Sequence, residues 1–226
     1  ATWYYNDSGL NGIQSPSNTA SGALSTAMGD STTASGVVST AMGRITTASG
    51  DFSTAMGYQT EASGYLSTAM GNQTTASGYC STAVGGYQTE ARGDFSTAMG
   101  RETTASGHAS TAIGRRTIAS GDTSTAIGTY TTASGDYSTA MGWQTTASGD
   151  FSTAMGSFTI ASERSSLVLG QYNLLGSTVT NSATDFSLEN TAFVIGNGTF
   201  SAGRSDALTV LSVSYTHLTL PTSVIV

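Results

Sequence analysis

The chain repeats one pattern of small, polar and apolar positions every fourteen residues. The stretch from Ser39 to Gly50 reads STAMGRITTASG, and the motif S-T-A-[MVI]-G returns at a fixed step. The step lengthens to fifteen once, where Gly85 and Gly86 stand side by side, and a weaker copy, SLVLG, follows in register. The motif begins at Ser25, Ser39, Ser53, Ser67, Ser81, Ser96, Ser110, Ser124, Ser138 and Ser152, and the weaker copy at Ser166.

Each repeat divides into two halves of seven residues with the same plan. Five residues suit a short strand, and a glycine with two variable residues suits a tight turn. Two strands and two turns make one coil of a flattened solenoid, in which neighbouring coils pair in parallel about 4.8 Å apart. Helices are excluded, because Thr, Ser and Gly are poor helix formers and glycine recurs every seven residues. The pattern predicts an all-β, parallel β-solenoid of 14-residue coils.

Strand alternation predicts which positions face the interior. Positions 1, 3 and 5 of each half are Ser or Thr, Ala and Gly, and we expect these small residues to fill the inside of a thin roll. Position 4 of the first half is apolar and faces outward. An exposed apolar stripe of this length needs covering, so we predict an interface with other copies of the chain. The expected interface residues are Met28, Met42, Met56, Met70, Val84, Met99, Ile113, Ile127, Met141 and Met155.

The two turns differ in character. The turn after ASG ends mostly in an apolar residue, such as Leu24 or Phe52, whereas the turn after AMG is more polar. Aromatic residues also occur in the polar turns, and exposed aromatic rings can stack on sugars or on collagen-like ligands. Isolated exposed aromatic residues are also common without a function. The possible ligand-contact aromatics are Tyr58, Tyr87, Tyr130 and Trp143.

Composition removes several function classes. Seven basic residues, all of them Arg, stand against fourteen acidic ones, which gives a net charge of −7. Binding to nucleic acid or to an anionic membrane surface needs clustered positive charge, so neither partner is expected. No apolar run is long enough to cross a bilayer. The single cysteine, Cys80, excludes a disulfide framework, and we expect it to act as a small apolar residue.

Two residue groups could carry chemistry, and each has a simpler explanation. Asp122, Asp136 and Asp150 follow glycine on consecutive coils, where a cation could relieve their repulsion, but Asp after Gly is also ordinary turn chemistry. His108 lies among many serines, yet a hydrolytic triad needs an acid that orients the base beside one activated Ser. We therefore predict no metal, no cofactor and no enzymatic activity.

The repeat resembles the head repeats of trimeric autotransporter adhesins (YadA-like head repeats), whose pattern is S-V-A-I-G-x-x-A-x-A-x-G-x-x. In one unit Ser39, Ala41, Gly43, Ala48 and Gly50 match, and Met42 stands for Ile. The resemblance covers about residues 18–170. It implies a left-handed β-roll, three chains side by side, and a place on a bacterial cell surface, with a host-surface protein, a matrix protein or a glycan as partner. It implies no catalytic residues.

The chain divides into four expected parts: residues 1–17 as a lead-in or cap, 18–170 as the roll, 171–211 as an irregular closing β segment, and 212–226 as a tail that fits no repeat. This tail resembles translated adapter sequence, which would make it non-native, and an apolar tail strand is the alternative. The segment from Ala192 to Leu211 resembles the closing segments of bacterial surface proteins and phage tail fibres. A phage fibre, or an extracellular filament subunit with a spacer role, is therefore the alternative to an adhesin. An ice-binding solenoid is a weaker one, because Glu61, Glu90 and Ile118 break the outward Thr column.

Overall fold

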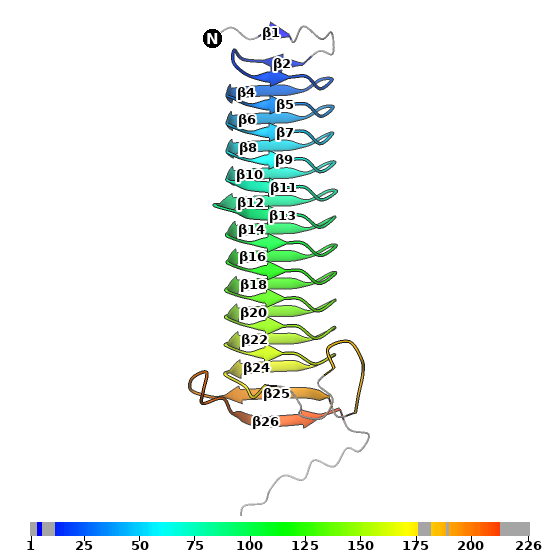
Figure 1. Cartoon of the computed structure of the whole chain (residues 1–226), viewed down its shortest axis with the longest axis vertical. Helices are drawn as coiled ribbons and strands as arrows, with labels where there is room; N and C mark the ends of the chain where they lie inside the picture. The colour runs from blue at the N-terminus through cyan, green and yellow to red at the C-terminus, as the bar shows by residue number, and fades with distance from the viewer. Residues whose placement is uncertain (1–3, 6–11, 176–181, 189, 213–226) are drawn as a thin grey trace, which may run out of the picture.

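The computed structural model describes residues 4–5, 12–175, 182–188 and 190–212, and these residues form a long rod made of stacked coils. Strand β1 lies at one end of the rod and strand β26 at the other (Figure 1). The described residues contain no helix with the length and apolar character that crossing a membrane requires.

The first sheet has fifteen strands and runs the whole length of the rod. Its members, in spatial order, are β1 (Tyr4–Tyr5), β2 (Ile13–Gln14), β4 (Thr26–Asp30), β6 (Thr40–Arg44), β8 (Thr54–Tyr58), β10 (Thr68–Asn72), β12 (Thr82–Gly86), β14 (Thr97–Arg101), β16 (Thr111–Arg115), β18 (Thr125–Thr129), β20 (Thr139–Trp143), β22 (Thr153–Ser157), β24 (Leu167–Gln171), β25 (Thr191–Asn197) and β26 (Asp206–Leu211).

The second sheet has eleven strands and ends before the first one does. In chain order it contains β3 (Thr19–Ala20), β5 (Thr33–Ala34), β7 (Thr47–Ala48), β9 (Glu61–Ala62), β11 (Thr74–Ala76), β13 (Thr89–Ala91), β15 (Thr104–Ala105), β17 (Ile118–Ala119), β19 (Thr132–Ala133), β21 (Thr146–Ala147) and β23 (Ile160–Ala161).

Neighbouring coils pair in parallel with identical positions side by side, so the predicted solenoid of 14-residue coils is confirmed. In the first sheet Ala41 pairs with Ala55 and Met42 with Met56, and in the second sheet Ala34 pairs with Ala48. The second strands are shorter than the expected five residues, at two or three. Beyond these strands the chain bends into the turn. There the N–H of the ASG glycine still donates to the next coil, as Gly36 N does to Ala48 O.

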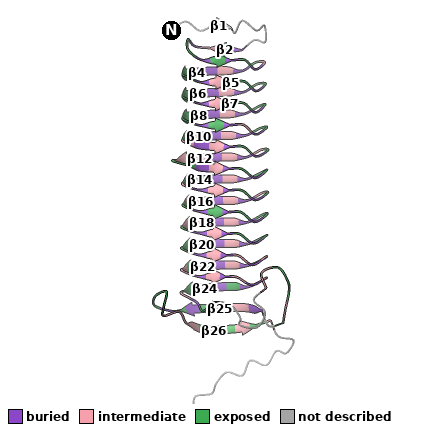
Figure 2. Cartoon of the chain, in the orientation of Figure 1, coloured by how far each residue is buried: buried purple, intermediate pink, exposed green. Residues whose placement is uncertain are grey.

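The interior contains the residues that the alternation predicts, with one correction. The alanines of both strands are almost entirely buried, as are the first-strand serines and second-strand threonines, such as Ser53 and Thr60 (Figure 2). The glycine just before the end of each first strand was also expected inside, and this is wrong for residues such as Gly43, which is exposed. Its side-chain hydrogen faces the next coil instead: a Cβ on Gly43 would lie 2.0 Å from the Gly57 carbonyl oxygen.

Both turns of each coil place a non-glycine residue in the left-handed region. Phe52, in the turn after ASG, has a φ of 58°, and Gln59, in the turn after AMG, has a φ of 52°. Single residues adopt this conformation at a cost, and most of these residues donate their N–H to the coil before them, as Phe52 does to Val37 O at 2.7 Å. The ladder of hydrogen bonds therefore continues through the turns.

The extra residue at Gly85–Gly86 is absorbed in a turn, as the sequence predicts. Thr82 pairs with Thr97 and Ala83 with Ala98, so the coils on both sides keep their register. The turn contains two left-handed residues in succession, Tyr87 and Gln88. The hydroxyl of Thr89 donates to the Gly86 carbonyl oxygen at 3.1 Å and closes the enlarged turn.

The C-terminal end of the rod is closed by a hairpin. Strand β25 returns to the first sheet in parallel register with β24, where Val194 pairs with Val168 and Gly196 with Gly170. Strand β26 then pairs with β25 in the antiparallel sense. Arg204, between these two strands, donates to the carbonyl oxygens of Phe158 and Asn173 and so ties the hairpin to the last coils.

Candidate functional site

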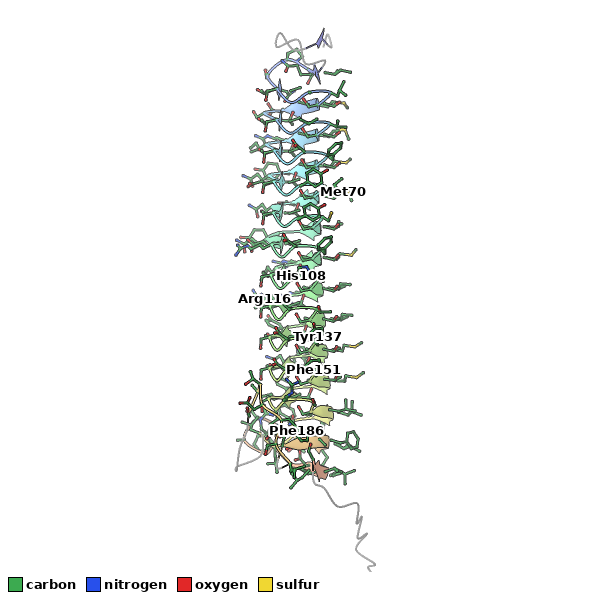
Figure 3. The ribbon with its side chains drawn as sticks, turned by 90° about the vertical axis from the view of Figure 1, so that its right-hand side faces the viewer. Met70, His108, Arg116, Tyr137, Phe151 and Phe186 are labelled. Atoms are coloured by element: carbon green, nitrogen blue, oxygen red, sulfur yellow. The ribbon has the colours of Figure 1, made fainter. Side chains whose placement is uncertain are left out.

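The predicted apolar stripe is continuous on the outer face of the first sheet. Strand pairing places Met28, Met42 and Met56 in direct register, and the same column continues to Met155, Leu169 and Ile195. In the single chain these side chains are half-buried or exposed, and Met99 is 41% exposed. Figure 3 shows Met70 projecting from one side of the rod, with the sulfur atoms of other methionines on that side.

The interior on the other side of this sheet is small and partly polar. In the described part of the chain, most inner Ser and Thr hydroxyls, including those of Ser67 and Thr74, have no hydrogen-bond partner. A buried hydroxyl without a partner costs about 1–3 kcal/mol, and alanine offers little apolar area in return. The apolar side chains that could stabilise the rod lie outside the roll.

A ladder of rings follows the turns after ASG. Ring centroids are 5.6 Å apart between Phe52 and Tyr65, and 5.3 Å between Tyr65 and Tyr79, which stack with nearly parallel planes. The ladder continues through Phe95 to His108. A second pair, Tyr137 and Phe151, stacks further along this edge. Phe52, Phe95, Tyr137 and Phe151, which the sequence places on the apolar edge, are all exposed there.

The opposite edge, after AMG, is more mixed than the sequence suggests. Trp143, Phe158 and Tyr172 form an aromatic row there, with centroids 4.7 Å and 4.3 Å apart. The same edge contains arginines that lie over tyrosine rings: Arg44 over Tyr58 at 5.7 Å, Arg101 over Tyr87 at 5.9 Å, and Arg116 over Tyr130 at 5.2 Å.

The four possible ligand-contact aromatics do not form one cluster. Tyr58 and Trp143 end first-sheet strands, whereas Tyr87 and Tyr130 lie in the turns that follow such strands. All four are exposed, and they are distributed along the edge on different coils. A ligand that contacts all of them would have to extend along the rod.

Glu102 is the charged centre of this edge. It pairs with Arg116 on the next coil and with Arg101 at 3.1 Å. The hydrogen bond from Arg116 lowers the pKa of the Glu102 carboxyl below its ordinary value, and the nearby positive charges add to this effect. Glu102 also raises the pKa of Arg116. Both groups are therefore charged at neutral pH.

The aspartates of the ASG turns bind the backbone of the neighbouring coil. The Asp136 carboxylate accepts the N–H of Asp122 at 2.9 Å, and the Asp150 carboxylate accepts that of Asp136 at 3.1 Å. Asp51 and Asp94 act in the same way on Val37 and Tyr79. This is turn chemistry, and the described residues contain no group of three or more His, Cys, Asp and Glu side chains arranged to hold a metal ion.

His108 packs against an aromatic ring rather than beside a nucleophile. Its ring lies edge-on to Phe95 at 5.6 Å, and its backbone N–H is bound by the Asp122 carboxylate at 3.2 Å. The motif serines on either side of it, Ser96 and Ser110, point into the roll and are fully buried. The structure does not bring the imidazole and a serine hydroxyl into a catalytic arrangement within the described residues.

Three residues at the ends of the roll were not identified from the sequence. Asn18 and Asn173 replace an inner Thr, and Glu163 replaces a buried Gly. Glu163 is buried and accepts the backbone N–H of Thr191, which begins the closing hairpin. The signal was present in the repeat register, because each of these residues departs from a column that otherwise hardly varies.

A cavity of about 310 Å³ opens where the second sheet ends. The side chains of Val168, Val194 and Leu211 line it, together with Glu163 and Asn173. It lies where a further second-sheet strand would continue from β23. The cavity is thus a consequence of how the roll terminates.

A regular roll of 14-residue coils, with two parallel sheets and an outward apolar column, defines the chain as a parallel β-solenoid. The family model of the YadA head domain repeat matches the chain in successive copies over residues 20–159, and the chain belongs to this family. The family is one of structural head repeats of adhesins rather than of enzymes. The comparison with curated proteins gave no match.

Proposed function

We propose that the chain forms a homotrimeric rod in the head of a surface adhesin, outside a bacterial cell, and that it binds through its repeated outer surface. The observation that carries this proposal is the column from Met28 to Met155, which is apolar at every coil and only half-covered in one chain. Membership of the YadA head family supports the adhesin assignment and the trimer.

Energetics favour association of the chains. The interior offers alanine methyl groups and hydroxyls without partners, whereas each outward Met would contribute roughly 1.5–3 kcal/mol if buried. Cyclic symmetry keeps equivalent columns at the same level along the rod. Three copies that place this column on a common axis would create the apolar core that one copy lacks.

The second sheet and the polar edge would then face outward and contact a host-surface protein, a matrix protein or a glycan. Tyr87 and Tyr130 lie in turns, are exposed and each stand beside an arginine, and these two are candidates for such contact. A spacer role in a phage tail fibre or extracellular filament is the second candidate function. Its support is the closing hairpin β25–β26, whose sequence resembles the closing segments of phage tail fibres as well as those of bacterial surface proteins.

Light scattering on the full chain tests the assembly, with an expected mass of three times 22.8 kDa. A stable monomer at micromolar concentration would contradict it. Binding of the trimer to immobilised matrix proteins, glycan arrays and host cells tests the adhesive role. A trimer that binds none of these surfaces would favour the spacer role.

A further inference from the structure

Two further columns flank the methionine column, one at each edge of the first sheet. Alternate residues of a strand share a face, so Thr54, Met56 and Tyr58 of β8 lie in one row, and Phe52 lies in the turn just before the strand, where its φ is 58°. The leading column precedes each strand and the trailing column ends it. The leading column is Leu24, Val38, Phe52, Leu66, Cys80, Phe95, Ala109, Thr123, Tyr137 and Phe151, and the trailing column is Asp30, Arg44, Tyr58, Asn72, Gly86, Arg101, Arg115, Thr129, Trp143 and Ser157.

Within one chain these two columns cannot touch each other. Six residues of extended chain separate Cys80 from Gly86, which corresponds to about 20 Å. Rings of the same chain cover these columns only in part: Phe52 remains 45% exposed, Phe95 53% and Trp143 50%. Large aromatic side chains left open at two edges of an apolar face indicate surface that another molecule covers.

At five of the ten levels the two columns carry similar or complementary residues. Phe52 precedes strand β8 and Tyr58 ends it, and Tyr137 precedes strand β20 and Trp143 ends it, so two levels are aromatic at both edges. Phe95 faces Arg101 across a third level. Cys80 and Gly86 are both small, and Thr123 and Thr129 are the same residue. At the remaining levels the leading column has an apolar residue and the trailing column a polar one. These levels are Leu24 with Asp30, Val38 with Arg44, Leu66 with Asn72, Ala109 with Arg115 and Phe151 with Ser157.

We propose that the trailing column of each copy packs against the leading column of the next copy and closes the seams of the trimer. All first-sheet strands between β4 and β24 run in the same direction. Rotation about an axis parallel to the rod therefore places the end of each strand beside the start of the equivalent strand in the next copy. The inference rests on the proposed trimer and adds which edges meet and in which register.

The chemistry of the matched levels suits such a seam. Arg101 already lies 5.9 Å from the Tyr87 ring centroid, and Phe95 of the next copy would present a second ring to the guanidinium. Phe52 against Tyr58, and Tyr137 against Trp143, are pairs of the kind that gain about 0.5–1.5 kcal/mol beyond their buried area. The seam also assigns Tyr58 and Trp143 to contact between copies, which leaves Tyr87 and Tyr130 for an external ligand.

A disulfide across the seam tests the inference with the native cysteine. In the variant Gly86→Cys, the new side chain is tolerated, because a Cβ on Gly86 meets no atom within 4 Å. A disulfide requires Cα atoms within about 7 Å, so Cys80 cannot react with position 86 of its own chain. Oxidation with diamide, which removes two hydrogens from each thiol pair, is expected to join three chains into one covalent trimer on a non-reducing gel.

Two control variants test whether the cross-link is specific to the seam and depends on Cys80. Ser77→Cys places a thiol on an exposed residue of the neighbouring ASG motif, away from the seam, and is expected to give no covalent trimer. Cys80→Ser combined with Gly86→Cys is expected to lose the trimer band. Light scattering on each reduced variant reports the oligomeric state independently of the cross-link.

The outcomes separate this inference from the proposed function. A non-covalent trimer in which Gly86→Cys gives no covalent trimer, or no more than Ser77→Cys gives, would overturn the seam and leave the trimer intact. A covalent dimer from Gly86→Cys would overturn the threefold arrangement. A monomeric wild-type chain would overturn the proposed trimer itself.

Discussion

Asn18 and Asn173 occupy the same position of the repeat, one at each end of the roll. Both stand in the column that elsewhere holds a buried Thr, and both are buried. The Asn18 side chain accepts the N–H of Thr32 at 2.8 Å and donates to Gly29 O at 2.9 Å. The Asn173 side chain accepts the N–H of Ile160 at 2.8 Å and donates to its carbonyl oxygen at 2.9 Å.

The Asn173 amide replaces a missing strand. In a regular coil the N–H of Thr146 donates to the main-chain oxygen of Thr159 on the next coil. At the last coil Ile160 donates to the side-chain oxygen of Asn173 instead, and the main-chain oxygen of Asn173 is free to accept from Arg204. One side chain thus ends the second sheet without leaving this backbone pair unpaired.

Substitution Asn173→Ala removes the partner of both backbone groups of Ile160. We expect the free energy of unfolding to fall by about 1–3 kcal/mol, the cost of leaving buried polar groups unpaired. Denaturant unfolding followed by circular dichroism measures this. Ser49→Ala, at an exposed position of an ASG motif outside both edge columns, is the control and should change little. Equal effects of the two substitutions would contradict the capping role.

Substitution Gly43→Ala should destabilise the rod, because its Cβ would lie 2.0 Å from the Gly57 oxygen and its φ is +123°. We expect a loss of more than about 1 kcal/mol. Gly86→Ala, where the Cβ has open space, should be neutral. Thermal unfolding of both variants tests the difference, and a Gly43→Ala protein as stable as Gly86→Ala would refute the close approach of coils.

The interior has no room for larger side chains. Ala69 is fully buried, so Ala69→Leu should destabilise the rod by about 1–3 kcal/mol or prevent folding. Ala109→Leu is the control, since the equivalent turn position holds Leu66 on another coil. Soluble yield and melting temperature distinguish the two. A stable Ala69→Leu protein would show that the roll is wider than the structure indicates.

Replacing Met56, Met70 and Met99 together by Asp should dissociate or unfold the rod, because each copy would then bring three negative charges to the proposed threefold axis. Each buried Met is expected to contribute roughly 1.5–3 kcal/mol. The control is the triple replacement by Ile, which the column already carries at Ile113 and Ile127. Light scattering should show a trimer for the Ile variant only. A trimeric Asp variant would exclude this face as the interface.

The Glu102 carboxyl should titrate below its ordinary pKa, because Arg116 donates to its charged form. A lowered pKa in the folded state stabilises the fold above the unfolded pKa, and this contribution is lost as the pH falls through the folded value. NMR titration of the Glu102 side-chain carbon measures the pKa. In Arg116→Gln it should rise toward the ordinary value. An unchanged pKa in that variant would contradict the hydrogen bond from Arg116 as its cause.

The repeat period alone was enough to predict the solenoid, its parallel pairing and the outward Met column. It worked because each column of a solenoid occupies one environment, so small residues at fixed offsets report the width of the interior. The exposed glycine of the first strand was misplaced, since a residue without a side chain does not indicate which way it faces. The need for glycine there comes from the neighbouring coil, as Gly43 and Gly57 show.

The ends of the roll were harder to predict for a related reason. A cap interrupts the repeat on which the prediction relies. Asn18 and Asn173 each stand where the other coils have Thr, and Glu163 stands where they have Gly. Strand β25 rejoins the first sheet only after an excursion of about twenty residues, and its register with β24 depends on long-range pairing. The proposed contacts between chains could be predicted from the sequence only by comparing the leading and trailing columns, which lie at opposite edges of the first sheet within one chain.

The hydrogen bonds between coils run along the rod, from the bond of Thr26 N to Ser39 O at 2.8 Å to that of Thr153 N to Ser166 O at 2.8 Å. A pull on the two ends therefore loads every junction between coils equally and in series. At each junction the bonds of both strands and both turns resist together, so a junction yields as a unit rather than by gradual fraying. A tether built in this way transmits force at nearly constant length until its weakest junction opens.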